Sequence, residues 1–378
     1  MDRANVVIIG GGVVGCAIAR ELSAKIGDVF VLERLPKLGM ATSSRNSGVI
    51  HSGLYYPPGS LKARLCVEGN RLTKEFCKAH GVPEEDCGKI IVASHEAEVG
   101  ELEKLAENGR ANGVEGLRIV GRDRIREREP HVAAVAALEV PSTGIVAAEE
   151  LTKAYARVAT DHGASVLMHA RVVGLDPRPD AIVVSIELGS PAEPDRLEHE
   201  SIESRCVINA AGLYADEVAA MVGNANYQIY PVRGEYAEVG RARAYLVNAL
   251  VYPLPHADHL SLGMHLTRTL WGTVLVGPTA TYVDGKDNYE RNRLPLEDFL
   301  SGAKPLLPEL TLEDIRLAYS GLRPKLVPPG GHVIADFVIT RDPKWSRVIH
   351  LVGIESPGLT SAPAIARYVQ PLVAETLS

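Results

Sequence analysis

Three glycines near the N-terminus have the spacing that binds a pyrophosphate. They lie in a G-x-G-x-x-G pattern formed by Gly10, Gly12, Val13, Val14 and Gly15. The first glycine permits a tight turn, the second lets the backbone approach a pyrophosphate, and the third lets a helix pack closely on a strand. The N-terminus of that helix supplies unpaired N–H groups and a partial positive charge to the phosphates. Glu33 follows about twenty residues later, where its carboxylate would accept hydrogen bonds from a ribose.

The surroundings of these residues predict the elements that position them. Val6–Ile9 and Val29–Leu32 are continuous apolar runs, and Cys16–Ala24 is an alanine-rich helical stretch between them. Taken alone, the glycines would also fit a turn without a ligand. The strand, turn, helix, strand and acid together favour an adenine dinucleotide site.

Composition narrows the class of protein. At 378 residues the chain is long enough for two domains. Its net charge of −7 and scattered basic residues argue against nucleic-acid binding. No apolar stretch approaches the roughly 18 residues that span a bilayer, and the first strand leaves no room for a signal peptide. Five cysteines without metal-like spacing predict free thiols. We therefore expect a cytoplasmic protein with at most peripheral contact at the inner membrane face.

Hydrophobic periodicity predicts two interleaved domains. The strand at 207–209 fits back into the dinucleotide-binding sheet, whereas 228–277 is rich in strands of an antiparallel sheet. Short helices are predicted at 294–308 and 311–319. The fold class is α/β, with a Rossmann-like domain interleaved with a smaller α+β substrate domain. The expected bounds are 1–82, 143–224 and 322–378 for the first domain, and 83–142 and 225–321 for the second.

Two further features favour FAD over NAD. The chain has a second glycine-rich strand-to-helix turn at Gly353 and Gly358, and an Asn-Ala-Ala-Gly turn after the returning strand. Residues 207–216 resemble the second FAD motif of the D-amino-acid-oxidase-like flavoproteins. Within that superfamily, five stretches resemble the L-2-hydroxyglutarate dehydrogenases and oxidases, namely 44–56, 60–66, 87–89, 233–236 and 263–268.

The resemblance implies a tightly held FAD and oxidation of a 2-hydroxy acid, with electrons passed to a quinone or oxygen. It leaves open the natural acceptor, the substrate's stereochemistry, the oligomeric state and covalent attachment of the flavin. The chain departs from the family at Thr279, in a shortened polar stretch at 284–293, and at 353–361. The first two departures bear on the acceptor, and the third on the flavin environment. The residues that the resemblance places around the cofactor, besides the glycine pattern and Glu33, are Arg34, Thr42, Ser43, Ser44, Arg45, Asn46, Ser47, Gly48, Val49, Ala210, Ala211, Gly212, Arg323, Pro357, Gly358, Leu359 and Thr360.

Oxidation of an alcohol beside a carboxylate needs a base for the hydroxyl proton and a cation for the carboxylate. His51 follows the polar loop that the family places under the flavin, so it is a candidate base or substrate ligand. Its alternatives are a backbone-bonded histidine and a covalent flavin anchor. His265 alternates with Met264 and Leu266 and therefore points away from the apolar face of its strand. It faces the active site if that sheet roofs the flavin, and is otherwise an ordinary surface histidine.

Arg233 and Arg323 are the candidate cations, because a planar guanidinium grips a carboxylate through two bonds. Arginines at strand ends also make structural ion pairs, and that alternative stays open for both. Tyr55 and Tyr252 could donate hydrogen bonds to the substrate. The pair at positions 256 and 259 has no third ligand nearby, so no metal site is predicted. Other functions on the same fold are oxidation of an amine, an amino acid or glycerol 3-phosphate, and a non-catalytic FAD-binding subunit.

Overall fold

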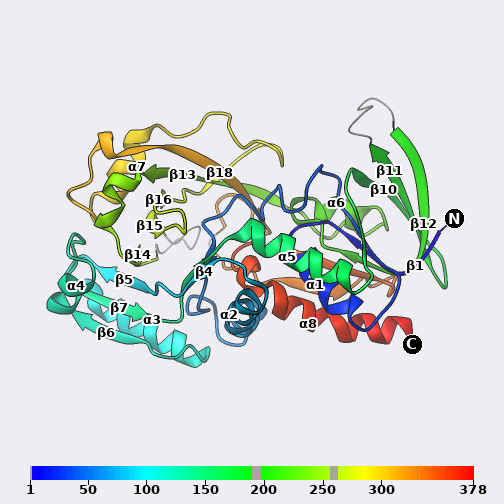
Figure 1. Cartoon of the computed structure of the whole chain (residues 1–378), viewed down its shortest axis with the longest axis horizontal. Helices are drawn as coiled ribbons and strands as arrows, with labels where there is room; N and C mark the ends of the chain where they lie inside the picture. Colours follow the sequence, from blue (N-terminus) through cyan, green and yellow to red (C-terminus); the bar gives the residue numbers. More distant parts are fainter. Residues whose placement is uncertain (1, 190–196, 256–262, 332) are drawn as a thin grey trace.

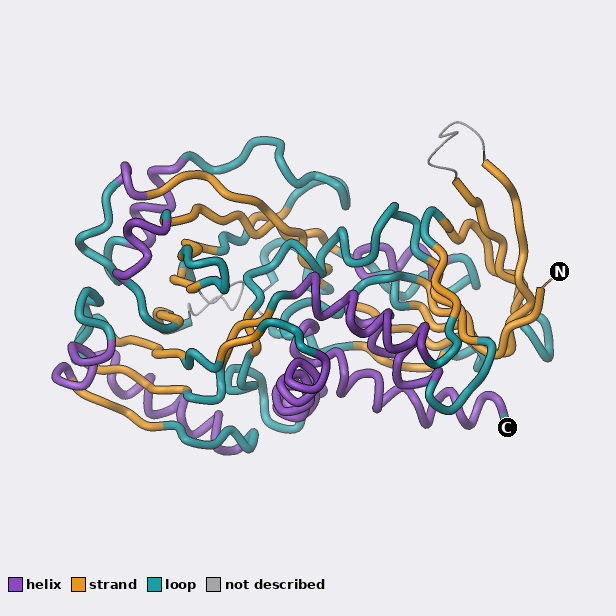
Figure 2. The backbone as a smooth tube through the Cα atoms, viewed as in Figure 1, coloured by secondary structure: helices purple, strands orange, loops and turns teal. Residues whose placement is uncertain are grey.

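The computed structural model describes residues 2–189, 197–255, 263–331 and 333–378, and two large sheets dominate it (Figure 1). The first sheet has eight strands. They include β1, near the N-terminus, and β20, just before the last helix. The second has nine strands. A small three-stranded sheet lies between the two large ones (Figure 1). Figure 2 shows helix α2 nearly end-on between the two large sheets.

Parallel strands form the centre of the first sheet, in the order β20-β12-β1-β2-β9. Alternate residues of β1 enter different cores: Val6 and Ile8 face the helices, whereas Val7 and Ile9 face the opposite side. Such a strand is buried on both faces, which explains its unbroken apolar sequence. The strands of this sheet are β1 (Asp2–Ile9), β2 (Val29–Leu32), β9 (Ser165–Leu167), β10 (Ala170–Pro177), β11 (Ile182–Gly189), β12 (Leu197–Asn209), β19 (Val338–Arg341) and β20 (Val348–Val352).

Helices α1, α5 and α8 cover one face of this sheet. Helix α1 packs against both α5 and α8, and α2 packs against α8. The hairpin β10–β11 and helix α6 cover the other face. Helix α2 begins after Ser60, whose Oγ accepts from Ala63 N–H at 3.1 Å, and ends at the left-handed Gly81. These are the capping residues expected from local sequence. The helices of this domain are α1 (Val13–Ser23), α2 (Leu61–His80), α5 (Ala148–Asp161), α6 (Ala215–Ala220) and α8 (Gly358–Leu377).

The second sheet is mainly antiparallel and carries its own core with α7. Strand β5 joins it through a parallel pairing with β14, which brings residues 89–93 beside residues 250–253. Its strands are β5 (Lys89–Ala93), β6 (Arg118–Gly121), β7 (Ala136–Val140), β13 (Tyr230–Val239), β14 (Leu250–Pro253), β15 (His265–Arg268), β16 (Val274–Gly277), β17 (Thr281–Tyr282) and β18 (Ile315–Lys325). The helices are α3 (Val99–Ala111), α4 (Arg122–Arg128) and α7 (Leu296–Ala303), and the small sheet consists of β3 (Val49–Ile50), β4 (Glu84–Glu85) and β8 (Gly144–Val146). The remaining short helical turns are η1 (Glu96–Glu98), η2 (Gly212–Tyr214), η3 (Arg241–Leu246) and η4 (Leu312–Asp314).

This arrangement confirms the predicted fold class, and it differs from the sequence prediction at one element. The helix predicted at 311–319 is wrong: only Leu312–Asp314 forms a short helical turn, and β18 starts at Ile315. Pairing with β13 from Val239 to Tyr230 overrides the local helical preference. Because β18 continues to Lys325, it crosses the domain boundary expected at residue 322.

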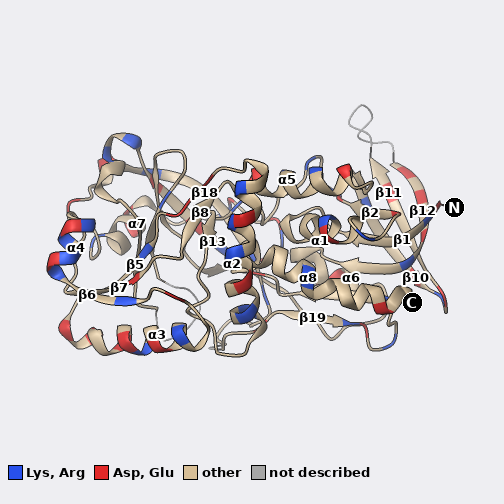
Figure 3. Cartoon of the chain, turned by 60° about the horizontal axis from the view of Figure 1, so that its bottom comes forward, with Lys and Arg blue, Asp and Glu red and all other residues tan. Residues whose placement is uncertain are grey.

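The distribution of charged residues and the state of the cysteines agree with what the composition predicts. Figure 3 shows Lys and Arg interspersed with Asp and Glu along α2, α3 and α4. All five cysteines are free, and four of them are buried. Across the described ranges, none of the helices combines the length and apolar character needed to cross a bilayer. The histidines at 256 and 259 lie outside the described residues.

Candidate active site

A cavity of about 530 Å³ runs between the two sheets and collects most of the predicted site residues. One end lies at the carboxyl ends of β1 and β2, and the other lies under the second sheet. That location is where open parallel sheets bind nucleotides. The predicted residues that line the cavity are Gly10, Gly12, Val13, Val14, Glu33, Arg34, Thr42, Ser43, Arg45, Asn46, Ser47, Val49, His51, Tyr55, Ala210, Ala211, Gly212, Tyr252, His265, Arg323, Pro357, Gly358 and Leu359.

The glycine turn has no room for side chains. Gly10 has a φ of +113°, and a Cβ there would lie 2.5 Å from the carbonyl oxygen of Ala210. A Cβ on Gly15 would lie 2.0 Å from the carbonyl oxygen of Gly10, so α1 packs directly on the turn. Helix α1 starts after Gly12, which has no side chain to cap it, and its first turn carries no acid. Its N-terminus therefore offers N–H groups and positive potential to a phosphate.

Glu33 stands at the end of β2 and is almost fully buried. Its two oxygens accept from the N–H groups of Gly11 and Leu35, each at 2.8 Å. A carboxylate has about four acceptor positions, so both oxygens retain capacity for a ribose diol. Gly11 also leaves space for the acid, because a Cβ there would lie 2.8 Å from Glu33 Cβ.

The polar loop after β2 folds onto the turn and onto the second domain. Ser43 Oγ accepts from Val13 N–H at 2.9 Å, which ties the loop to the start of α1. Thr42 Oγ1 donates to the carbonyl of Leu322 on β18 at 3.0 Å. Asn46 closes the loop on itself, since its side chain donates to the Ser43 carbonyl and accepts from Gly48 N–H. The loop therefore links the two domains along the wall of the cavity.

Four predicted cofactor residues lie behind this wall. Gly15 packs α1 on the turn, and Gly48, with a φ of +67°, passes against the carbonyl of Val146. Thr360 Oγ1 is buried, accepts from His51 N–H at 2.9 Å and donates to the carbonyl of Val49 at 3.2 Å. Ser44 is half-buried and does not line the cavity. The first three shape the site by fixing the position of the backbone around it.

His265 and Tyr252 form the roof at the other end. Their rings stack with centroids 3.7 Å apart and planes at 19°. His265 Nδ1 lies 2.9 Å from the carbonyl oxygen of Gly263, so Nδ1 carries the hydrogen and Nε2 is free to accept. Burial lowers the pKa of His265 to about 3, with the charge of Lys89 adding to the effect. The ring is therefore neutral at physiological pH.

His51 lies on the loop that follows β3. Its backbone is held by Thr360 and by Asn70, whose side chain donates to the His51 carbonyl at 2.9 Å. Nε2 lies 3.4 Å from Ser356 Oγ, whereas the buried Nδ1 has no hydrogen-bond partner among the described residues. Burial lowers the pKa of His51 to about 3 as well. An unpaired buried nitrogen beside a cavity indicates a missing ligand.

Arg323 lies on β18 and lines the cavity. Gly234 of β13 makes space for it, because a Cβ there would lie 2.8 Å from Arg323 Nη2. Nη1 donates to the carbonyl of Thr279 at 3.1 Å. Among the residues that the structure describes, Thr279 is the one hydrogen-bond partner of Arg323, which leaves most of the five guanidinium donors available for a carboxylate.

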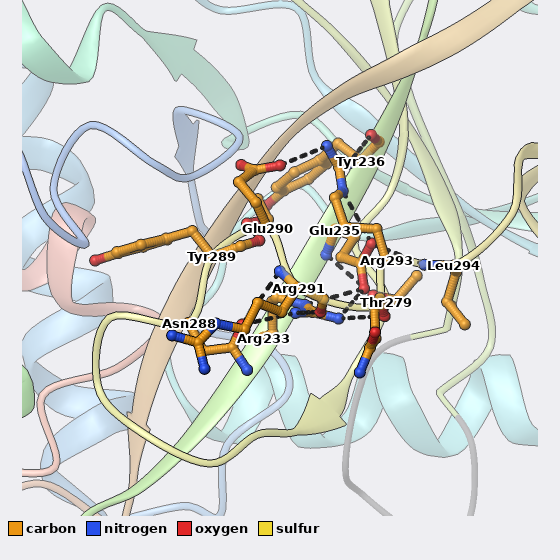
Figure 4. Close-up of polar contacts among 12 residues, drawn as sticks. Arg233, Glu235, Tyr236, Thr279, Asn288, Tyr289, Glu290, Arg291, Arg293 and Leu294 are labelled. Carbon is orange, nitrogen blue, oxygen red and sulfur yellow. Dashed lines mark hydrogen bonds and ion pairs between the residues drawn. The ribbon is translucent and has the colours of Figure 1, made fainter.

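Arg233 is placed differently from its prediction. It is 2% exposed, does not line the cavity, and pairs with Glu235 at 2.9 Å. Its other donors bind the carbonyls of Arg291 and Asn292, and Arg293 pairs with the second oxygen of Glu235 (Figure 4). The physical reason is that side chains alternate along β13, so Arg233 and Glu235 share the face opposite to Gly234. The alternative of a structural ion pair fits this arginine.

Sequence reasoning missed two groups of charged residues. Glu355 lies on the cavity wall between Lys62, at 3.0 Å, and Lys325, at 3.3 Å. Burial alone would raise the pKa of Glu355, but the two lysines hold it below its usual value. Lys89 is fully buried next to the roof. The sequence signal for Lys89 was its place at the start of an otherwise apolar strand.

Comparison with known proteins identifies the family. Residues 5–372 match the family described as FAD dependent oxidoreductase. The chain belongs to this family. It is 33% identical to an L-2-hydroxyglutarate dehydrogenase of Escherichia coli K12, covering 96% of this chain and 91% of that one. It is 32% identical to a human mitochondrial protein of the same name, covering 96% and 87%.

The solved structures agree with the family. An L-alpha-glycerophosphate oxidase from Mycoplasma pneumoniae with FAD bound superimposes with a TM-score of 0.86 at 27% identity, covering 99% of this chain and 95% of that one. The prediction of FAD is confirmed, and the protein is an FAD-dependent oxidoreductase acting on a small molecule. The glycine cradle fits the pyrophosphate of FAD, Glu33 fits the ribose of its adenosine half, and the unpaired nitrogen of His51 fits its flavin half.

Proposed function

We propose that the protein oxidises a 2-hydroxy acid, L-2-hydroxyglutarate or a close analogue, to the 2-oxo acid. The observation that carries this proposal is the joint presence of Arg323 and two neutral histidines, His51 and His265, in the lining of one cavity. A cation beside a neutral base is the pair that oxidation of an alcohol next to a carboxylate requires. The names of the curated relatives support the same substrate class.

Bound FAD supplies the acceptor for the hydride that leaves the substrate carbon. Arg323 binds the carboxylate and fixes the orientation of the reacting C–H bond. His265 accepts the hydroxyl proton at Nε2, because its Nδ1 hydrogen is committed to the Gly263 carbonyl. The stacked ring of Tyr252 holds that imidazole in place. The N-terminus of α8, opened by Gly358 on the cavity wall, directs positive potential toward the cofactor.

A quinone or oxygen would then take up the electrons. The two candidate acceptors can be compared by the rate at which each reoxidises the reduced protein. Mixing anaerobically reduced protein with oxygen or with a soluble quinone, and following the return of the flavin absorbance, separates them. The faster of the two oxidants at matched concentration is the better acceptor.

Glycerol 3-phosphate is a second candidate, favoured by the structural likeness to the glycerophosphate oxidase. Its phosphate dianion would also be held by Arg323 and by the lysines around Glu355. A panel of L-2-hydroxyglutarate, D-2-hydroxyglutarate, glycerol 3-phosphate and glycine in anaerobic mixing discriminates these reactions. We expect L-2-hydroxyglutarate to bleach the flavin fastest. Bleaching by glycerol 3-phosphate or glycine alone would replace the proposal.

Variants of the two histidines test which of them takes the proton. His265→Asn should slow flavin reduction by roughly 10²- to 10⁴-fold, the usual contribution of a general base. His51→Asn is the matched control, since it removes the other buried imidazole that lines the cavity. We expect the smaller loss for that variant. A larger loss in His51→Asn would assign the base to His51.

A further inference from the structure

Lys89 is a buried cation at the edge of the candidate active site. It opens β5, a strand whose five residues are all buried, and its own side chain is inaccessible to solvent. Its Nζ lies 4.5 Å from the ring centre of Tyr55 and 4.7 Å from that of Tyr252. Both tyrosines line the cavity, whereas Lys89 stands behind them. Two aromatic faces stabilise a cation at such distances, yet they carry no charge to neutralise it.

The other buried lysine of this region shows what Lys89 lacks. Lys62 is 3% exposed and pairs with Glu355 at 3.0 Å. Within the described ranges, no Asp or Glu lies within ion-pair distance of Lys89; its one hydrogen-bond partner is Tyr55 Oη, at 3.4 Å. A buried charge without a counter-ion is costly. Burial accordingly lowers the pKa of Lys89 to about 7.

The titratable groups around Lys89 are all neutral near pH 7. They are Tyr55, Tyr252 of β14, Cys66 of α2, His51 and His265 of β15. Burial raises the pKa of the two tyrosines and of the thiol, and lowers that of both histidines. Within this group the ammonium of Lys89 is therefore the one charge once the pH falls below about 7, and the side of the cavity next to it accommodates a negative charge.

In the charged form of Lys89, the hydrogen bond to Tyr55 also has a fixed direction. An ammonium donates three hydrogens and accepts none, so Tyr55 Oη must be the acceptor. The hydrogen of the Tyr55 hydroxyl then points away from Lys89. Because Tyr55 lines the cavity, that hydrogen is available to an acceptor atom of a bound ligand.

We propose that Lys89 is a positioning residue that makes the site selective for anionic substrates, by fixing Tyr55 as a hydrogen-bond donor and by supplying the buried charge that a substrate carboxylate neutralises. The inference rests on the proposed function only for the identity of the carboxylate. It deepens that function by adding a cation that, unlike Lys62, is not paired with a carboxylate among the described residues.

This role couples ligand binding to a proton. In the empty site, the neutral form of Lys89 gains population as the pH rises through about 7. A bound anion favours the charged form, so binding at pH 8 takes up protons. At pH 6 Lys89 is already charged, and uptake should be near zero. The histidines behave in the opposite way, since any uptake by groups with a pKa of about 3 grows as the pH falls.

The test is calorimetric titration of the oxidised FAD-loaded protein with 2-oxoglutarate, in buffers of different ionisation enthalpy, at pH 6 and pH 8. The wild-type protein should take up more protons at pH 8 than at pH 6. Lys89→Met should take up none at either pH and bind at least tenfold more weakly at pH 6. The matched control is Lys74→Met, which removes a lysine paired with Asp86 outside the cavity and should behave as wild type.

Each outcome has one meaning. Uptake that is larger at pH 6, or that persists in Lys89→Met, overturns the inference and assigns the proton to a histidine. Absence of uptake in the wild-type protein at both pH values, or absence of binding, also overturns it; this measurement stands even if Lys89→Met does not fold. Failure of the proposed function is seen separately, as an unbleached flavin with L-2-hydroxyglutarate, and leaves pH-dependent uptake with 2-oxoglutarate intact.

As a readout of turnover, kcat/KM should fall above about pH 7 in the wild-type protein, because the charged Lys89 of the free enzyme is lost there. That limb should be absent in Lys89→Met. A change in kcat alone, with KM and the pH profile unchanged, would indicate a merely structural lysine.

Discussion

Substitution of Gly15 by alanine tests whether the close packing of α1 on the glycine turn creates the cofactor site. The new Cβ would lie 2.0 Å from the carbonyl oxygen of Gly10 and 3.2 Å from its carbonyl carbon. Both atoms belong to the backbone, so no side chain can rotate away. Helix and turn must separate by about 1 Å before the contact becomes tolerable, and overpacking of this kind costs about 1–3 kcal/mol.

The strain can appear in stability or in FAD affinity. If the turn opens to relieve it, the N–H groups of α1 move away from the pyrophosphate. A loss of 1–3 kcal/mol then weakens FAD binding roughly 5- to 150-fold. If the turn does not open, the free energy of unfolding of the apoprotein falls by a similar amount. We expect the sum of the two losses to lie in this range.

The assay is fluorescence titration of the apoprotein with FAD, together with urea unfolding of the apoprotein. The matched control is Gly100→Ala in α3, another glycine inside a helix, where a Cβ would meet nothing within 4 Å. That variant should be stabilised by roughly 0.5–1 kcal/mol and bind FAD normally. Gly15→Ala with both unchanged FAD affinity and unchanged stability would refute the packing argument.

Three further predictions follow from the site. Arg323→Lys should raise KM for L-2-hydroxyglutarate roughly tenfold or more while changing kcat less, because a lysine cannot grip a carboxylate through two bonds; Arg341→Lys, on β19 and away from the cavity, should leave both constants unchanged in the same steady-state assay. The pKa of about 3 for His265 means that the base is protonated only at low pH, so stopped-flow flavin reduction at saturating substrate should not fall between pH 7 and pH 5; a tenfold fall would contradict the assignment. Arg233→Met should destabilise the apoprotein by about 3 kcal/mol in urea unfolding, because it breaks a buried ion pair within β13. Arg316→Met, which breaks an exposed pair between β18 and β13, should cost under about 1 kcal/mol.

Local sequence was sufficient where the structure depends on neighbouring residues. The glycine turn, the helix that follows it and the acid of Glu33 all lie within 35 residues, and each has a backbone reason for its residue type. The capping residues Ser60 and Gly81 bound α2 for the same reason. The alternation of strand positions places His265 toward the cavity, because side-chain direction in a strand follows from position alone.

Contacts between distant segments explain what the sequence did not reveal. Arg233 binds carbonyls 58 and 59 residues further along the chain, and no local pattern contains that pairing. The surroundings of Lys89 form only when β5 pairs with β14, which brings Tyr252 beside it. The strand β18 forms against β13, although its own residues favoured a helix. In each case tertiary pairing outweighs local preference.

The most direct test of the active-site assignment is a crystal structure of the FAD-loaded protein with 2-oxoglutarate bound. Our assignment predicts a carboxylate within hydrogen-bond distance of the Arg323 guanidinium and the C2 oxygen within hydrogen-bond distance of His265 Nε2. A ligand held instead by Lys62 and Lys325, with Arg323 and His265 untouched, would contradict it.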